Sequence, residues 1–306
     1  MIILMQCSIE QKSKWGGTLT KRTKKIWLIV FAIVISLILF FYYQNNSIIT
    51  TEISFTSKNI PQDFDGYKIV QLSDVHNTTF GNNQSVLVEK VKKAKPDVIV
   101  VTGDLIDSYT YDEEPSLILM EQLVKITPVY YVTGNHEWRT GTFHSLEGKL
   151  QNLGVRVLRN ETNEISIGSA TIQMIGIDDP SKLFDTEHYL TEEEIAEESI
   201  IDSMKGLEEG SFNILLSHRP ELFHLYAQQD LDLVFTGHAH GGQIRIPFIG
   251  GIIAPNQGFF PKYTSGAHTL NDTTMIVNRG LGNSLFPLRV FNRPEIVVVT
   301  LESTQN

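Results

Sequence analysis

The sequence predicts two packed β-sheets with helices on their outer faces, preceded by one membrane-spanning helix. Short β-branched runs alternate with helical segments through the first half of the chain, and strands follow one another closely in the second half. An uncharged apolar run of 18 residues lies near the N-terminus. Alternating strands and helices are typical of a parallel sheet, and strands in close succession indicate a further sheet.

Three apolar runs in the first half each end at a polar loop. Residues 68–72, 98–101 and 129–132 are expected to be strands, and residues 85–95 and 117–126 have the apolar spacing of helices. We therefore expect β–α–β units with parallel strands, whose carboxyl ends meet at one edge. Open α/β sheets build their binding sites at that edge.

The second half is predicted to be richer in strands. Residues 165–167 and 170–177 are expected to form a hairpin. Further strands are expected at residues 213–216, 233–236, 275–277 and 295–301. Residues 185–210 are acidic and predicted to be helical, with Thr191 and Glu194 forming a capping box. This segment is either a lid beside the site or a solvated surface helix.

Residues 26–43 form the predicted membrane-spanning helix. Eighteen residues at 1.5 Å each extend about 27 Å, close to the thickness of a bilayer's hydrocarbon core. Four basic side chains lie directly before this run, at residues 21–25. The positive-inside rule keeps them in the cytoplasm and sends the rest of the chain across. The expected divisions are a basic cytoplasmic tail (1–25), the anchor (26–43), a linker and first strand region (44–65), and an extracytoplasmic catalytic domain (66–301).

Two other interpretations fit the apolar run less well. A cleaved signal peptide needs a shorter apolar core and a small-residue cleavage site, which the residues after Phe40 do not supply. A buried core helix is expected to be amphipathic, whereas this run is apolar all round. We therefore expect a single-pass protein of the cell membrane. Residues 44–52 are expected to be a short polar linker, which holds the domain within a few tens of Å of the bilayer.

Charge is distributed unevenly along the 306 residues. Residues 1–50 carry six basic and one acidic side chain, and the remainder carries 19 basic and 34 acidic ones. An acidic domain repels phosphate backbones, so no nucleic acid binding is expected. Cys7 is the only cysteine, which excludes an intramolecular disulfide.

Five short polar blocks follow the predicted strands in one order, at residues 74–76, 103–104, 134–137, 217–218 and 237–241. Their carboxylate, amide and imidazole groups suit two adjacent divalent ions of Mn, Fe, Zn, Co or Ni, without distinguishing among these metals. Two such ions can share a hydroxide that attacks a phosphate ester in line. The candidate ligands are Asp74, His76, Asp104, Asn135, His218, His238 and His240.

His136 is the candidate catalytic residue. It directly follows a candidate ligand in sequence, so it is not expected to reach the same metal. It is suited to protonate the leaving oxygen or to stabilise the charge that develops on the phosphoryl group. Glu137 is a candidate to orient it, with Asp104 or a backbone carbonyl as alternatives. Asn77 and Arg279 are further candidates for supporting or substrate-binding residues.

The five blocks resemble the signature of the calcineurin-like metallophosphoesterase superfamily over residues 66–301. The resemblance implies a four-layer αββα sandwich with a dinuclear centre at one edge. One metal is then expected to be held by Asp74, His76, Asp104 and His240. The other is expected to be held by Asp104, Asn135, His218 and His238. His136 takes the position of the family's catalytic histidine, and Glu137 stands where the family often has aspartate.

Residues 241–247 and 278–282 resemble a membrane-associated bacterial subgroup of phosphodiesterases, some of which cleave UDP-2,3-diacylglucosamine. The resemblance implies a hydrolase, a phosphodiesterase or pyrophosphatase acting at the cell envelope on a lipid-linked or nucleotide-sugar phosphate. The alternatives are a phosphomonoesterase or protein phosphatase, and a non-catalytic metal-binding envelope protein. Residues 246–253 and 258–261 are expected to form either an apolar rim for acyl chains or an ordinary core strand and loop.

Overall fold

The computed structural model describes residues 20–183, 190–208, 210–283 and 286–304. The chain divides into two compact units, residues 1–42 and residues 43–306. Helix α1 (Lys21–Asn46) contains the predicted anchor, and within the described ranges it alone is long and apolar enough to cross a bilayer. Its length and apolar composition are those of a membrane-inserting segment, a class that includes both anchors and signal sequences.

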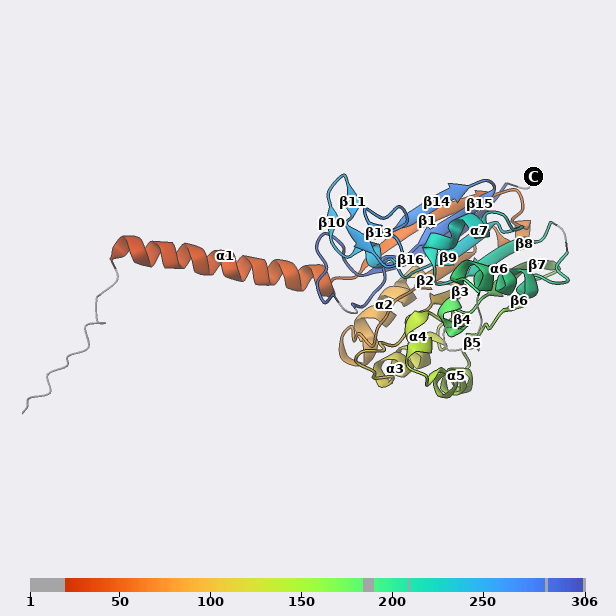
Figure 1. Ribbon diagram of the computed structural model, residues 1–306, viewed down its shortest axis with the longest axis horizontal. Helices are drawn as coiled ribbons and strands as arrows, with labels where there is room; N and C mark the ends of the chain where they lie inside the picture. The colour runs from red at the N-terminus through yellow and green to blue at the C-terminus, as the bar shows by residue number, and fades with distance from the viewer. Residues whose placement is uncertain (1–19, 184–189, 209, 284–285, 305–306) are drawn as a thin grey trace, which may run out of the picture. The chain divides into compact units, whose positions relative to one another are not determined.

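The second unit is built around two six-stranded sheets (Figure 1). The first sheet has the strand order β1 (Ile49–Ser57), β16 (Glu295–Ser303), β2 (Lys68–Leu72), β3 (Val98–Thr102), β4 (Val129–Val132) and β5 (Arg156–Val157). The second sheet has the strand order β14 (Gly266–Leu270), β15 (Thr273–Val277), β9 (Leu233–Thr236), β8 (Phe212–Leu216), β7 (Ala170–Gly176) and β6 (Glu161–Ile167). Strands β2 to β5 are parallel to one another, as are β7, β8, β9 and β15. Each sheet therefore presents several carboxyl ends at one edge.

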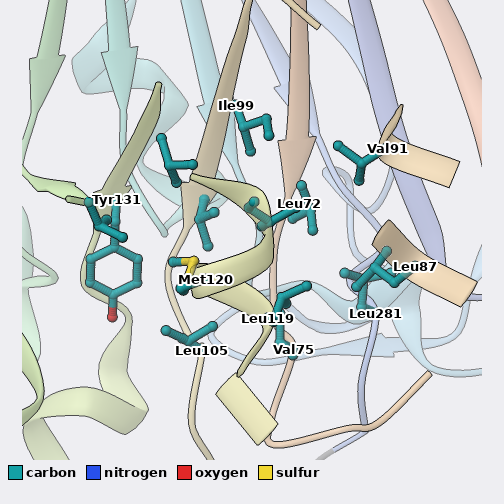
Figure 2. Packing of buried hydrophobic residues seen from close by; sticks show 14 of the residues in the cluster. Leu72, Val75, Leu87, Val91, Ile99, Leu105, Leu119, Met120, Tyr131 and Leu281 are labelled. Atoms are coloured by element: carbon teal, nitrogen blue, oxygen red, sulfur yellow. The ribbon is translucent and has the colours of Figure 1, made fainter. Parts of the chain in front are cut away.

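Helices cover the outer face of each sheet. Helices α2 (Ser85–Ala94), α3 (Glu114–Leu123) and α5 (Phe143–Asn152) share a buried apolar cluster with β2, β3 and β4. Figure 2 shows this cluster, with Leu119 and Met120 of α3 lying near Leu72 and Ile99 of the sheet. Helices α6 (Glu192–Ser203) and α7 (Phe223–Tyr226) share a second cluster with β7, β8 and β9.

A third apolar cluster fills the space between the sheets. Val98 and Val100 of β3 belong to this cluster, together with Met174 and Ile214 of the second sheet. Their neighbours in β3, such as Ile99, point to the helical side, because side chains alternate along a strand. Both faces of the central strands are thus buried, which explains their continuous β-branched sequences. Three clusters between four layers confirm the predicted αββα sandwich.

Residues 44–52 differ from the expected polar linker. Helix α1 continues to Asn46 and β1 begins at Ile49, so only two residues separate them. The guanidinium of Arg293 donates to the carbonyl and the hydroxyl of Ser47, at 2.9 and 2.6 Å. The second unit therefore begins directly at the end of the helix. The sequence did not reveal this because β1 pairs with β16, at the far end of the chain.

Helix α6 confirms the predicted capping box. The Glu194 amide donates to the Thr191 hydroxyl at 3.2 Å, and the Thr191 amide donates to the Glu194 carboxylate at 2.7 Å. Ala196 and Ile200 are buried against the second sheet, while Glu193, Glu194 and Glu198 are exposed, so α6 is a surface helix that packs on the sheet by one face. Residues 184–189 and 209 of the expected 185–210 segment lie outside the described residues.

Two small hairpins follow the last predicted ligand. They are β10 (Arg245–Ile246) with β11 (Gly250–Gly251), and β12 (Ile253–Ala254) with β13 (Gly258–Phe259). Figure 1 shows β10 and β11 projecting beyond the large sheets. Phe248, Ile249, Phe259 and Phe260 are exposed, so these residues are not an ordinary core strand and loop.

Candidate metal centre

The predicted ligands meet where the carboxyl ends of the two sheets converge. Those on the first sheet follow β2, β3 and β4, and those on the second follow β8 and β9. Because these strands are parallel neighbours within each sheet, their terminal loops lie side by side. Every one of these side chains is buried: Asp74, His76, Asp104, Asn135, His218, His238 and His240.

A first group of donors comprises Asp74, His76, Asp104 and His240. Their ligand atoms all lie within 4.8 Å of one another. His240 Nε2 is 3.3 Å from Asp74 Oδ1 and 3.1 Å from His76 Nε2. His76 Nε2 is in turn 3.6 Å from Asp104 Oδ2. Two carboxylates and two imidazoles therefore face one point.

A second group comprises Asp104, His218 and His238, which also lie within 4.8 Å of one another. His218 Nε2 is 3.2 Å from Asp104 Oδ2 and 3.1 Å from His238 Nδ1. Asp104 Oδ2 is thus common to both groups, while Asp104 Oδ1 accepts the backbone N–H of His136 at 2.9 Å. The structure brings together the first set that the family pattern implies and three of the four members of the second set, namely Asp104, His218 and His238. Their assignment as ligands of two separate ions stays a prediction.

Several side chains in the two donor groups have lone pairs that could bind a cation and that no hydrogen-bond donor among the described residues satisfies well. Nε2 of His76 and Nε2 of His240 face each other at 3.1 Å. Burial lowers the pKa of His238 and His240 well below the usual range, so both rings are neutral at pH 7, the form in which an imidazole binds a metal. Asn135 Oδ1 is buried without a hydrogen-bond partner among the described residues. This N/O donor set fits a divalent metal.

The electrostatic field of the site also favours positive charge. Burial raises the pKa of Asp74 to about 6. Burial opposes protonation of His218, yet the carboxylates of Asp104 and Asp74 raise its pKa to about 10. The Nδ1 atom of His218 donates to the carbonyl of Thr102 at 2.7 Å, which leaves Nε2 to face Asp104. A field that holds a proton so strongly at Nε2 also favours a metal ion there.

The ligand loops adopt a backbone conformation that is uncommon for residues other than glycine. Asp74, His76, Asp104, His238 and His240 all have positive φ, between 46° and 63°. Such conformations persist only where surrounding structure enforces them, and they concentrate at functional sites. Here they let Asp74 and His76, two residues apart, direct both side chains to one point.

Glu137 supports the backbone of the Asp104 loop rather than His136. Its carboxylate accepts the N–H groups of Asp104 at 3.0 Å, Leu105 at 2.8 Å and Gly134 at 2.7 Å. Burial, followed by the neighbouring charge of Asp104, raises the pKa of Glu137 to about 8. Glu137 thus fastens the loop after β3 to the start of α4 (Asn135–Arg139), which carries Asn135.

His136 lies at the rim of the donor groups. Its Nε2 is 4.0 Å from Asp104 Oδ2, and its Nδ1 accepts the backbone N–H of Ser108 at 3.0 Å. The hydroxyl of Ser108 is also 3.0 Å from Nδ1, and Asp107 Oδ1 is 3.8 Å away. Burial lowers the pKa of His136 against the opposing effect of Asp104 and Asp107. The sequence analysis missed Asp107 and Ser108, although both lie in the loop that begins at Asp104.

The other two candidate residues have supporting contacts. The amide of Asn77 donates to the Thr110 carbonyl at 2.7 Å and accepts the Asp107 N–H at 3.1 Å, so it braces the loop behind His136. Arg279 Nε is 3.7 Å from a carboxylate oxygen of Glu295. Asn77 and Arg279 are not among the described residues that line the cavity over the donor groups.

Arg279 belongs to the 278–282 segment, which packs against the Asp74 loop. The N–H of Leu281 donates to the Ser73 carbonyl at 3.0 Å, and that of Gly282 donates to the Asp74 carbonyl at 2.6 Å. A side chain at Gly280 would lie 2.8 Å from the Cβ of Asp74. This second sequence motif therefore supports a candidate ligand from behind.

A cavity of about 260 Å³ opens over the donor groups. Arg139 and Asn256 line both this cavity and a neighbouring one of about 540 Å³. Arg139 is exposed, and its guanidinium has no hydrogen bond or ion pair with any described residue. Its guanidinium is therefore available to an anionic ligand beside His136.

Arg219 and Asp179 form a buried ion pair next to the centre. Arg219 Nε and Nη2 donate to the two carboxylate oxygens of Asp179 at 2.5 and 2.9 Å. Arg219 Nη1 is 3.4 Å from His238 Nε2. The pair fixes one side of a candidate ligand. The sequence could have indicated this pair, because Asp179 closely follows β7 and Arg219 closely follows β8, which are neighbouring parallel strands.

Comparisons with known proteins agree with this geometry. Residues 67–242 match the family described as calcineurin-like phosphoesterase. The chain is 34% identical over 263 residues to the uncharacterized metallophosphoesterase YkuE of Bacillus subtilis, covering 83% of this chain and 86% of that one. It is 30% identical over 266 residues to the bovine (Bos taurus) transmembrane protein with metallophosphoesterase domain, covering 83% of this chain and 57% of the longer bovine protein. The chain belongs to the calcineurin-like metallophosphoesterase family. Membership implies a metal-dependent hydrolase of phosphoesters.

Proposed function

We propose that this chain is a membrane-anchored phosphodiesterase or pyrophosphatase that works with two divalent metal ions. The observation that carries the proposal is the position of Asp104 Oδ2, which lies 3.6 Å from His76 Nε2 in one donor group and 3.2 Å from His218 Nε2 in the other. A shared carboxylate oxygen between two sets of N/O donors suits a pair of adjacent ions. Asn135 Oδ1 would complete the second set.

The protein's own residues have distinct roles in this proposal. Two bound divalent ions supply polarisation of the phosphoryl oxygens and an activated water. His136, whose Nδ1 accepts the Ser108 N–H, would donate a hydrogen bond from Nε2 to the leaving oxygen and stabilise the charge that develops there. Arg139 would bind a non-bridging oxygen or a second anionic group of the substrate, since no carboxylate among the described residues pairs with its guanidinium. Glu137 keeps the Asp104 loop in place.

The cavities favour a diester or an anhydride over a simple monoester. A diester carries a substituent on each side of the phosphorus, so it needs room beyond the donor groups. The 540 Å³ cavity supplies that room, and Arg139 and Asn256 connect it to the centre. Trp138, Lys182 and Arg219 line it, which suits a polar or anionic substituent. A phosphomonoesterase or protein phosphatase is the second candidate.

The substrate class follows from the anchor. With only two residues between α1 and β1, the catalytic unit stays at the surface of the membrane that α1 would cross. We propose that the cluster of basic residues before the anchor lies in the cytoplasm, with the catalytic unit outside. A lipid-linked or nucleotide-sugar phosphate at the envelope is the substrate class that fits this location.

Hydrolysis of two chromogenic esters tests the reaction type. The full-length protein, reconstituted with Mn²⁺ or Zn²⁺, should hydrolyse bis-p-nitrophenyl phosphate with a higher kcat/KM than p-nitrophenyl phosphate. Arg139→Ala should raise KM for both esters and leave metal content unchanged. A preference for the monoester would support the phosphatase alternative. His136→Asn, purified in parallel, controls for contaminating phosphatases.

A further inference from the structure

We propose that the exposed apolar residues of the two small hairpins form a bilayer-contact surface that seats in the headgroup region of an anionic membrane. This hairpin surface comprises Phe248, Ile249, Phe259, Phe260 and Phe291. The inference rests on the proposal that α1 spans a membrane, and it adds which face of the catalytic unit meets that membrane.

The end of α1 is held on the same part of the unit as the hairpin surface. The guanidinium of Arg293 lies 4.6 Å from the ring centroid of Tyr43, and Asn45 Oδ1 accepts the Arg289 N–H at 2.8 Å. Phe291 lies between these two arginines in sequence. The residues where the chain leaves the predicted span are thus packed against the segment that carries Phe291.

Phe291 is in turn continuous with the hairpins. The Arg245 N–H donates to the Val290 carbonyl at 2.9 Å, and residues 245–250 line a shallow cavity of about 360 Å³ together with Phe291. Ile252 links the two hairpins, because its N–H donates to the Ile244 carbonyl at 2.9 Å, directly before β10, and its carbonyl accepts the Phe260 N–H at 2.8 Å. The apolar residues therefore lie on connected segments, one of which packs against Tyr43 and Asn45 at the end of α1.

The exposure of these side chains indicates a partner. Phe248 at the tip of the first hairpin is fully exposed, and Phe259 and Phe260 are 74% and 68% exposed. Neighbouring aromatic rings left in water mark an interaction surface on a folded protein. Aromatic side chains on a short hairpin can enter the headgroup and acyl boundary of a bilayer, as the apolar face of an interfacial helix does.

The charge around the hairpin surface matches an anionic membrane. Residues 246–261 contain no charged side chain and are flanked by Arg245 and Lys262. Lys262 is exposed and Arg245 and Arg293 are half-buried beside the hairpin surface, in a domain whose charge is otherwise strongly negative. Basic residues beside an apolar surface attract anionic lipid headgroups. A second copy packed symmetrically through the same surface would instead bring basic residues against basic residues.

The surface also leads to the catalytic cavity. Pro255, between the strands of the second hairpin, and Phe286 line the cavity that contains His136. Seating the hairpins in the headgroup region would therefore open the catalytic cavity at the level of lipid phosphates. A lipid-linked substrate could then reach the centre without leaving the bilayer completely.

Site-specific fluorescence on the full-length chain tests the surface. In a Cys7→Ser background, single cysteines replace Phe248 and Phe260, and each is labelled with an environment-sensitive dye. The protein is reconstituted in vesicles of phosphatidylethanolamine and phosphatidylglycerol that contain a lipid with a shallow nitroxide. Both labels should shift to shorter emission wavelength and lose intensity to the nitroxide. In phosphatidylcholine vesicles without anionic lipid, the quenching should be weaker.

Two control positions make the outcomes distinct. Val86, exposed on α2, should carry a label that stays unquenched, and Ile35 in the predicted span should be quenched by a deep nitroxide. Quenching at 35 without quenching at 248 and 260 overturns the bilayer contact and leaves the anchor intact. No quenching at 35 overturns the anchor and the contact together. A blue shift at 248 and 260 without lipid quenching would mean that a second copy covers the surface, and this also overturns the contact. Hydrolysis of bis-p-nitrophenyl phosphate by the same vesicles reports the proposed activity independently.

Discussion

The backbone N–H of Ser108 donates to Nδ1 of His136 at 3.0 Å. An acceptor at Nδ1 places the proton of the neutral ring on Nε2, which is the nitrogen that faces Asp104. The loop after β3 therefore fixes the tautomer in which the Nε2–H group of the neutral ring can donate a hydrogen bond to an oxygen of the substrate, and it does so through a main-chain N–H group.

His136→Asn should retain the fold and the metal content while lowering kcat by about 10²–10⁴-fold. The loss should be smaller for esters with good leaving groups, because these stabilise the developing negative charge themselves. Pre-steady-state or steady-state rates across a series of aryl phosphodiesters measure this dependence, and elemental analysis measures the metal. Loss of metal from the variant would instead make His136 a ligand.

Asp104→Ala should remove both metal ions together, because its Oδ2 atom is shared by the two donor groups. Asn135→Ala should remove mainly one ion, because Asn135 Oδ1 would complete only one of the two proposed ligand sets. Metal content per chain after equilibrium dialysis, determined for Mn²⁺ and Zn²⁺ separately, distinguishes the two variants. Equal stoichiometry in both would contradict the bridging position of Asp104.

The ion pair between Asp179 and Arg219 should stabilise the fold at neutral pH and lose its effect in acid. Burial alone would raise the pKa of Asp179, but Arg219 outweighs it and holds the pKa below the ordinary value of 3.8. A depressed carboxyl pKa contributes stability above pH 3.8 that disappears as pH falls through the folded-state value. At pH 7, Asp179→Asn should cost about 3 kcal/mol, since Arg219 is left buried without its main partner.

Urea unfolding of the metal-free protein between pH 7 and pH 3 measures this effect. The difference between parent and Asp179→Asn should be constant down to about pH 5 and shrink below pH 3.8. Asp202→Asn is the matched control, because its pair with Lys205 is exposed and is expected to contribute less than about 1 kcal/mol. A pH-independent difference for Asp179→Asn would contradict the pKa assignment.

Two glycine substitutions should have opposite effects on stability. A Cβ at Gly237 would overlap the hydroxyl of Ser73 and approach Asp74, so Gly237→Ala should destabilise the fold by about 1–3 kcal/mol and weaken metal binding. Gly148 lies inside α5 with open space around it, so Gly148→Ala should stabilise by about 0.5–1 kcal/mol. Thermal unfolding with and without metal compares them. A neutral Gly237→Ala would mean that the Asp74 loop can shift.

The orientation of the anchor is testable by cysteine accessibility in cells stripped of their wall. A membrane-impermeant maleimide should label Val86→Cys in intact cells of a Cys7→Ser strain, because Val86 is exposed on the catalytic unit. In the parent, Cys7 should be labelled only after lysis. The reverse pattern would place the catalytic unit in the cytoplasm, where nucleotide-sugar precursors are made.

Local sequence patterns predicted the strands next to the centre with close agreement. Expected strands at 68–72 and 129–132 coincide with β2 and β4, and 233–236 coincides with β9. These strands are buried on both faces, so their apolar composition alone identifies them. The candidate ligands could be predicted for a related reason, because each of them follows a recognisable strand.

Contacts between distant segments could not be predicted in the same way. The role of Glu137 as an acceptor for the Asp104 loop depends on two loops 33 residues apart meeting in space. The exposure of Phe248 and Phe260 is likewise invisible locally, because a short apolar run has the same composition in a core strand and on a surface hairpin. In both cases tertiary packing decides what the local pattern leaves open.

The pairing of β1 with β16 affects how the protein is made. Strand β16 lies between β1 and β2, pairing in parallel with the first and antiparallel with the second. As the ribosome delivers the chain from its N-terminus, the first sheet cannot close until residues 295–303 have emerged. If the anchor inserts early, the nascent domain crosses the membrane before its long-range contacts form, when it is still unfolded enough to pass through a narrow translocation pore. The last strand synthesised thus completes the sheet next to the first.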